Sequence, residues 1–147
     1  MNTSSILLVE DHAGFADALL RVLNTDKNLN VVAVAESAEK ALEQLPNLKV
    51  DLVLADVSLP QMNGINLVGE LREKYPGLLC MVLSGHLSSE YAHRAMDAGA
   101  RGYVIKDNPV GILEGIRRVL KGEIYMSEEL GDSLLGPPTA TAGMPSV

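Results

Sequence analysis

Five side chains that could do chemistry stand at the ends of short apolar runs. They are the carboxylates of Glu10, Asp11 and Asp56, the hydroxyl of Ser84 and the ammonium of Lys106. Carboxylates that gather at one place repel each other and raise one another's pKa unless a cation lies among them. Oxygen ligands without a Cys or His cluster favour a hard cation. Mg²⁺ fits best, because it binds one or two carboxylates, several waters and a phosphate oxygen.

The lysine and one carboxylate extend this chemistry to phosphate. Lys106 would be a compact positive charge for a phosphate group. A carboxylate beside a metal ion and a lysine can act as a nucleophile and form an aspartyl phosphate. The sequence therefore predicts that Asp56 accepts a phosphoryl group. Pro60 and the Asn63–Gly64 pair are expected to shape the turn that leads away from it.

Each of these features alone has an ordinary structural explanation. An acidic pair after a strand more often caps a helix, a Ser-Gly pair is usually a turn, and a single lysine is usually solvated. The functional interpretation rests on their joint occurrence after four apolar runs of one chain.

These side chains meet only if the apolar runs are neighbouring strands with the same direction. Five runs are aliphatic and too short for helices, which favours parallel strands covered on both faces. They span residues 6–9, 31–35, 52–55, 78–83 and 102–105. Helical patterns lie between them and after the last one, and Ser37 is the expected N-cap of the second helix.

The alternation of strands and helices predicts an α/β fold with right-handed crossovers. We expect a five-stranded parallel sheet of order 2-1-3-4-5 in a flavodoxin-like three-layer sandwich. Ligands bind outside the carboxyl ends of the strands in such a sheet. Because the first, third, fourth and fifth strands are neighbours in this order, the five side chains should gather at one edge.

Composition narrows the class of protein. The 147 residues fit one domain, and the net charge of −7 argues against a nucleic-acid-binding face. The single cysteine, Cys80, cannot form an internal disulfide, so we expect it to be buried in a cytoplasmic protein. Neither a signal peptide nor a run long enough to span a bilayer is visible, so we expect no membrane contact.

Four motifs carry a resemblance to a known family. LLVEDH, LVLADVSLPQMNG, VLSG and GYVIKD resemble the receiver domain of bacterial two-component response regulators, over about residues 5–125. VEDH, the KD pair and GEIYMSEEL resemble the LuxR/NarL/FixJ subgroup. We therefore expect a receiver domain at 1–125 and an extension at 126–147, flexible from about residue 136, where the sequence becomes GPPTATAGMPSV.

The resemblance assigns roles at the metal and the phosphoryl group. It implies that Asp56 is the phosphoacceptor and that Lys106 pairs with the phosphoryl oxygens. It also implies that Glu10, Asp11, Asp56 and the backbone carbonyl of Ser58 hold Mg²⁺.

Further roles concern switching and signal lifetime. The resemblance implies that Ser84 is the switch hydroxyl and Tyr103 the switch aromatic, which rotates inward on phosphorylation. Ser58 and His86 are expected to tune dephosphorylation. Asp107 departs from the proline of many receivers, which leaves the path of the loop after Lys106 open. Of the remaining histidines, His12 is expected to be solvated.

The expected function is a phosphorylation-dependent receiver of a two-component system. Its partners would be a histidine kinase or phosphotransfer protein and, on phosphorylation, a second copy of the chain. The output would be transcription through a DNA-binding domain that the sequence does not contain. The linker-like tail favours the interpretation that the chain is a fragment of a longer regulator. A receiver-only adaptor and a pseudo-receiver remain alternatives. An aspartate-nucleophile phosphatase would want Asp-x-Asp, and Ser58 stands at the second position. We expect no enzyme that acts on a separate substrate.

Overall fold

A parallel sheet of six strands organises the protein. The computed structural model describes residues 3–86 and 88–127, and within them the strand order is β2-β1-β3-β4-β5-β6. The strands are β1 (Ser4–Val9), β2 (Leu29–Ala35), β3 (Leu52–Asp56), β4 (Leu79–Ser84), β5 (Gly102–Ile105) and β6 (Tyr125–Met126). The helices are α1 (Ala13–Leu23), α2 (Ala38–Gln44), α3 (Gly64–Lys74), α4 (Ser89–Ala98) and α5 (Pro109–Leu120), with a 3-10 helix η1 at Leu45–Asn47.

The predicted order 2-1-3-4-5 is confirmed, and the predicted number of strands is wrong by one. The two-residue strand β6 pairs in parallel with β5, with Tyr125 opposite Gly102 and Met126 opposite Tyr103. A strand this short has no alternating apolar pattern to reveal it. The chain packs on the sheet through Ser127, which is buried. The tail predicted to be flexible from residue 136 lies outside the described residues.

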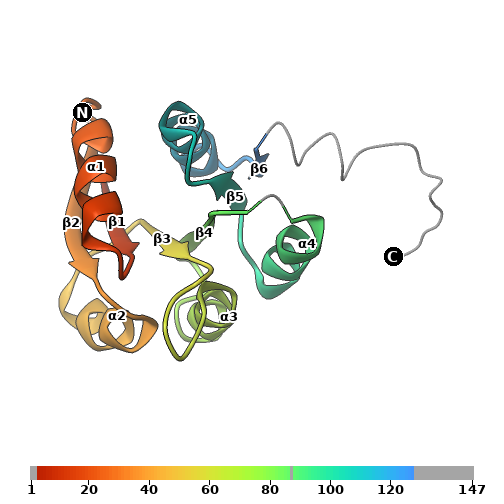
Figure 1. The fold of residues 1–147 in the computed structure, drawn as a ribbon. Coiled ribbons are helices and arrows are strands. Elements are labelled where there is room, and N and C mark those ends of the chain that lie inside the picture. Colours follow the sequence, from red (N-terminus) through yellow and green to blue (C-terminus); the bar gives the residue numbers. More distant parts are fainter. Residues whose placement is uncertain (1–2, 87, 128–147) are drawn as a thin grey trace.

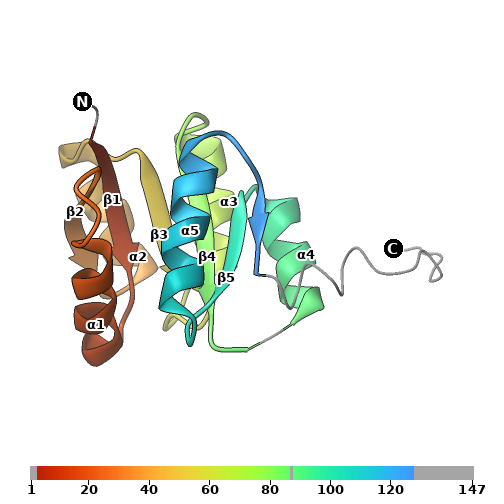
Figure 2. The ribbon, with the colours of Figure 1, turned by 90° about the horizontal axis from the view of Figure 1, so that it is seen from above.

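Three layers are visible when the sheet is viewed along its strands. Helices α1 and α5 cover one face, and α2, α3 and α4 cover the other (Figure 1). Each face has its own core of buried side chains. The core under α1 and α5 contains Ile6, Leu8, Leu52 and Leu54. The alternate residues of the same strands, such as Leu7 and Val53, belong to the core under α2, α3 and α4. Figure 2 shows the same layers from above.

Side-chain alternation along the strands determines where the polar residues at their ends point. Successive side chains of a strand point to opposite faces. Continued past the last core residue of each strand, the alternation places Glu10, Asp56 and Lys106 on the α1/α5 side. It places Ser84, like Tyr103, on the side of α4. The sheet therefore separates the acidic groups and the lysine from the Ser84 and Tyr103 pair.

Local capping explains where several helices begin. The Ser37 hydroxyl accepts a hydrogen bond from the backbone N–H of Lys40 at 3.1 Å, as predicted for the N-cap of α2. The Asn63 side chain does the same for α3, where its Oδ1 accepts from the N–H of Asn66 at 2.8 Å. The Asn63–Gly64 pair is thus a helix start. No helix among residues 3–86 and 88–127 has the length and apolar character needed to cross a membrane.

Candidate functional site

The carboxylates and the lysine meet at the carboxyl ends of β1, β3 and β5. The Lys106 Nζ lies 2.8 Å from Oε1 of Glu10 and 3.1 Å from Oδ2 of Asp56. Both carboxylates are buried, at 2 % exposure each, while Asp11 beside them is exposed. Strands far apart in sequence thus bring together four of the five predicted side chains.

An aromatic ring completes the surroundings of the lysine. The Lys106 Nζ lies 4.6 Å from the centre of the Phe15 ring, on the first turn of α1. A ring face attracts a cation through its quadrupole, so Phe15 stabilises the ammonium where water is partly excluded. Nothing in the local sequence predicted a role for Phe15 at this site. Its contact with a lysine far along the chain depends on the tertiary fold.

Burial and charge act in opposite directions on these groups. Burial raises the pKa of Glu10, and the Asp56 carboxylate adds to the rise while Lys106 opposes it. For Lys106, burial would lower the pKa, but the bonds to Glu10 and Asp56 outweigh it and raise the pKa. The lysine therefore stays an ammonium at neutral pH. The site has one positive group among three carboxyl groups.

The acidic cluster fits a divalent cation. One oxygen from each of Glu10, Asp11 and Asp56 lies within 4.8 Å of the others. Oε1 of Glu10 is buried and is paired with the Lys106 ammonium at 2.8 Å. A set of three carboxyl groups with one ammonium keeps an excess of negative charge and offers only oxygen ligands, which suits Mg²⁺. The backbone carbonyl of Ser58 follows Asp56 closely in sequence, and the Ser58 side chain is exposed.

Asp56 is held in place by its own turn and by helix α3. Its Oδ1 accepts a hydrogen bond from the Ser58 N–H at 3.1 Å. The start of α3 lies against its backbone, because a Cβ on Gly64 would overlap the Asp56 carbonyl oxygen and lie 2.8 Å from its carbonyl carbon. Glycine at position 64 thus permits the close approach of helix and strand.

We expect Gly64→Ala to destabilise the fold by at least about 1–3 kcal/mol, because an added Cβ would meet backbone that cannot move aside. Gly69→Ala, on the same helix with nothing within 4 Å of its added Cβ, should instead be neutral or stabilising by up to about 1 kcal/mol. Urea unfolding of both variants measures this. Equal stabilities for the two variants would contradict the close approach at Asp56.

Ser84 and Tyr103 meet at a single backbone carbonyl. The Ser84 hydroxyl donates to the carbonyl of His86 at 2.9 Å, and the Tyr103 hydroxyl donates to the same oxygen at 3.3 Å. Tyr103 is fully buried, and burial raises its pKa. The structure therefore has the ring already inward, where the sequence predicted a rotation from outside. His86 is exposed, and its expected role in dephosphorylation stays a prediction.

His12 links the acidic pair to the start of helix α1. His12 is exposed, as expected for a solvated side chain, and its Nδ1 accepts a hydrogen bond from the Phe15 N–H at 3.0 Å and caps α1. Its own N–H donates to Oε2 of Glu10 at 3.1 Å. Its position directly after the acidic pair and before a helix was the signal available. In the loop after Lys106, Asp107 is reached without a cis peptide bond.

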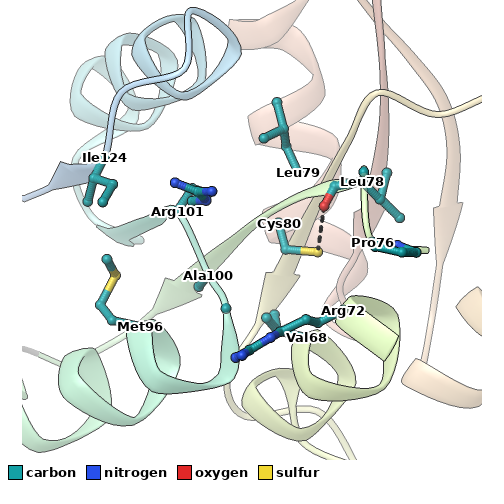
Figure 3. A pocket seen from close by; sticks show the side chains of 12 residues that line it. Val68, Arg72, Pro76, Leu78, Leu79, Cys80, Met96, Ala100, Arg101 and Ile124 are labelled. Atoms are coloured by element: carbon teal, nitrogen blue, oxygen red, sulfur yellow. Dashed lines mark hydrogen bonds between the residues drawn. The ribbon is translucent and has the colours of Figure 1, made fainter. Parts of the chain in front are cut away.

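A cavity of about 580 Å³ lies at the other end of the sheet. Figure 3 shows it between α3, α4 and the beginnings of β4 and β5, with Arg72 and Arg101 at its rim and Cys80 in its wall. The predicted burial of Cys80 is confirmed, and burial raises the pKa of its thiol to about 12. Because its lining includes none of the predicted site residues, this cavity is separate from the carboxylate site.

Comparisons with known proteins place the chain in a family. A family model described as the response regulator receiver domain matches residues 6–121. The chain is 28 % identical over 135 residues to the transcriptional regulatory protein DegU of Brevibacillus brevis, covering 91 % of this chain and 57 % of that protein. It is 31 % identical over 128 residues to the nitrate/nitrite response regulator protein NarL of Escherichia coli K12, covering 86 % and 59 %. The chain thus spans less than two thirds of the length of these relatives.

Solved structures share the fold. A crystal structure of a LuxR-family two-component response regulator from an Aurantimonas species superposes with a TM-score of 0.86 at 29 % identity, covering 89 % of this chain and 94 % of that one. The isolated receiver domain of RcsB from Salmonella enterica, in the presence of a beryllofluoride phosphomimetic, has a TM-score of 0.82 at 22 % identity, covering 88 % and 97 %.

Proposed function

Since the chain belongs to the response regulator receiver domain family, with relatives of the LuxR/NarL type, we propose that it is phosphorylated on Asp56 as part of two-component signalling. The donor would be a histidine kinase or a phosphotransfer protein. The observation that carries the proposal is the Lys106 ammonium, which contacts the buried carboxylates of Glu10 and Asp56 at the strand ends.

The chemistry is an in-line transfer. An Asp56 carboxylate oxygen attacks the phosphorus of the donor's phosphohistidine, so that an O–P bond forms and the P–N bond breaks. The electron pair of that bond stays on the imidazole, which takes up a proton. When bound by Glu10, Asp11, Asp56 and the Ser58 carbonyl, Mg²⁺ supplies positive charge that neutralises the phosphoryl oxygens.

The remaining site residues position and read the phosphoryl group. Lys106 shifts from Asp56 Oδ2 toward a phosphoryl oxygen, which keeps its charge paired. Phe15 limits where the ammonium can go. The protein assists its own phosphorylation and dephosphorylation and is not an enzyme acting on a separate substrate. The positioning of charged groups is most of what phosphoryl transfer requires.

The names of the relatives support a proposal for what the signal controls. Several carry names of transcriptional regulators, so we infer that phosphorylation controls transcription, with a second copy of the chain as a partner. The net charge of −7 disfavours direct nucleic-acid binding by this domain. A receiver-only adaptor that acts through protein contacts is the alternative.

Small-molecule phosphodonors test the proposal without knowledge of the kinase. Incubation with acetyl phosphate and Mg²⁺ should add one phosphoryl group per chain by intact-mass spectrometry. The group should be lost on treatment with hydroxylamine, which cleaves acyl phosphates. A hydroxylamine-stable adduct, or no adduct, would contradict the proposal.

The switch should depend on the Ser84 hydroxyl. We expect Ser84→Ala to accept a phosphoryl group but to show smaller beryllofluoride-induced NMR shifts in α4 and Tyr103. A hydrogen bond to a charged group contributes about 1.5–3 kcal/mol, a large part of the roughly 5.5 kcal/mol needed to move an equilibrium from 1:99 to 99:1. Ser89→Ala, which alters an exposed serine of α4, is the control. Shifts of full size in Ser84→Ala would refute the coupling.

Signal lifetime should depend on His86. Hydrolysis needs water in line with the Asp56–phosphorus bond, and the bulky imidazole should obstruct that approach. His86→Ala should therefore shorten the phosphoryl half-life severalfold, whereas His93→Ala, at an exposed position on α4, should not. Ser58→Asn should change the half-life without changing the acceptor. The measurement is decay of the labelled protein in excess Mg²⁺. A longer half-life in His86→Ala would mean that the imidazole assists hydrolysis.

A further inference from the structure

The last described residues bind β5, the strand that carries Tyr103 and leads to Lys106. Ser127 is buried at 5 % exposure. Its backbone N–H donates to the Tyr103 carbonyl at 3.0 Å, and its hydroxyl accepts from the Ile105 N–H at 3.1 Å. The serine side chain thus supplies the acceptor for a buried N–H just beyond the end of β6.

Helix α5 holds the other end of this segment. The Tyr125 ring packs with the core on the α1/α5 face. A Cβ on Gly115 would lie 2.7 Å from Cδ2 of Tyr125 and 3.1 Å from Cγ1 of Val104. Glycine at position 115 therefore leaves room for the ring between α5 and β5. We call residues Tyr125–Ser127 the C-terminal strap.

Two short routes connect the phosphoryl site to Ser127. In the first, Lys106 contacts Asp56, and the preceding residue, Ile105, donates its N–H to Ser127. The second starts at Ser84, the switch hydroxyl of the proposed function. Ser84 and Tyr103 share the His86 carbonyl, and the Tyr103 carbonyl accepts from the Ser127 N–H. Both routes end on Ser127, which is buried. It binds the backbone of Tyr103 and of Ile105, the residue before Lys106.

We propose that the C-terminal strap is a coupling element that docks when Tyr103 lies inward and Lys106 is engaged at the site, with Ser127 as its positioning residue. The docked strap and the inward ring occur together in the structure. A phosphoryl group that favours the inward position of the Tyr103 ring then also favours the docked strap, so phosphorylation stabilises the docked strap. This coupling would transmit the signal to the chain that follows Ser127, and that consequence rests on the proposed function.

Coupling between two sites is reciprocal, which makes the proposal testable from the strap. Ser127→Ala removes the acceptor of the Ile105 N–H without touching the carboxylates or the lysine. It should weaken beryllofluoride binding on the order of fivefold or more, the lower end of ordinary allosteric coupling. It should also speed hydrogen exchange of the Ile105 amide and shift the ring signals of Tyr103 without any beryllofluoride. Ser127→Thr, which keeps the hydroxyl, should restore all three.

Two further variants separate coupling from a general loss of stability. Ser37→Ala removes the N-cap of α2, a bond of the same kind with no contact to β5, and should leave beryllofluoride affinity unchanged. Gly115→Ala displaces the Tyr125 ring from the α5 side and should reproduce the effect of Ser127→Ala. If Ser127→Ala binds beryllofluoride within about twofold of the parent while the Ile105 amide loses protection, the strap is not coupled to the site.

The proposal and the proposed function fail in different ways. If the parent protein neither binds beryllofluoride nor accepts a phosphoryl group, the proposed function is wrong. The coupling between the C-terminal strap and the switch is then tested by the NMR signals of the Tyr103 ring alone. Ring signals that move in Ser127→Ala and return in Ser127→Thr would support the coupling, and signals that stay unchanged would overturn it.

Discussion

Asp56→Asn should abolish labelling by acetyl phosphate. The amide keeps the size of the side chain but is not a nucleophile, and the structure has no second buried carboxylate at the end of β3 among its described residues. The expected change is complete loss of the mass adduct with the fold intact.

The matched control for this variant is Asp51→Asn. Asp51 precedes the same strand at its other end, where its Oδ2 accepts a hydrogen bond from the Ser5 N–H at 2.7 Å. The variant makes the same chemical change far from Lys106, so it should label like the parent protein. Undiminished labelling of Asp56→Asn would end the assignment of the acceptor.

Removal of the metal should have the second large effect. Neutralising the phosphoryl oxygens with a metal ion contributes several kcal/mol to the transition state, and 1.36 kcal/mol is a factor of about ten in rate. Excess EDTA should therefore slow labelling of the parent protein by more than about tenfold. Asp11→Ala should slow it in Mg²⁺ and weaken Mg²⁺ binding measured by titration.

The exposure of Asp11 makes this variant a clean test. The Asp11 side chain is exposed while Glu10 and Asp56 are buried, so its loss removes one repulsive charge and leaves the core packing intact. Asp17→Ala, an exposed carboxylate on α1, controls for the change in net charge and should label normally. If Asp11→Ala in the presence of EDTA is labelled as fast as the parent protein in Mg²⁺, the metal does not take part in the transfer.

Much of the site was predictable because parallel strands present their carboxyl ends at one edge. Glu10, Asp56, Ser84 and Lys106 follow the predicted apolar runs, and in the structure they stand at or directly after the carboxyl ends of β1, β3, β4 and β5. The side of the sheet was also implicit in the sequence, since alternation from Leu54 to Asp56 and from Val104 to Lys106 assigns both to the α1/α5 face. A period of two was enough to decide it.

The remaining features depend on contacts that a local pattern does not contain. Phe15 reaches Lys106 across 91 residues of sequence, and the packing of α1 beside α5 on one face of the sheet brings them together. Strand β6 is two residues long, and it binds the sheet through backbone groups and Ser127. The need for glycine at position 64 arises from the backbone of Asp56, which no pattern of side chains reveals.

The central claim is that the Asp56 carboxylate, which contacts Lys106, accepts the phosphoryl group. Borohydride converts an aspartyl phosphate to homoserine, which marks the modified residue permanently. The parent protein, labelled with acetyl phosphate in Mg²⁺, reduced and sequenced by tandem mass spectrometry, should carry homoserine at position 56. Homoserine at Asp11 or another carboxylate, with Asp56 unchanged in the labelled protein, would contradict the account.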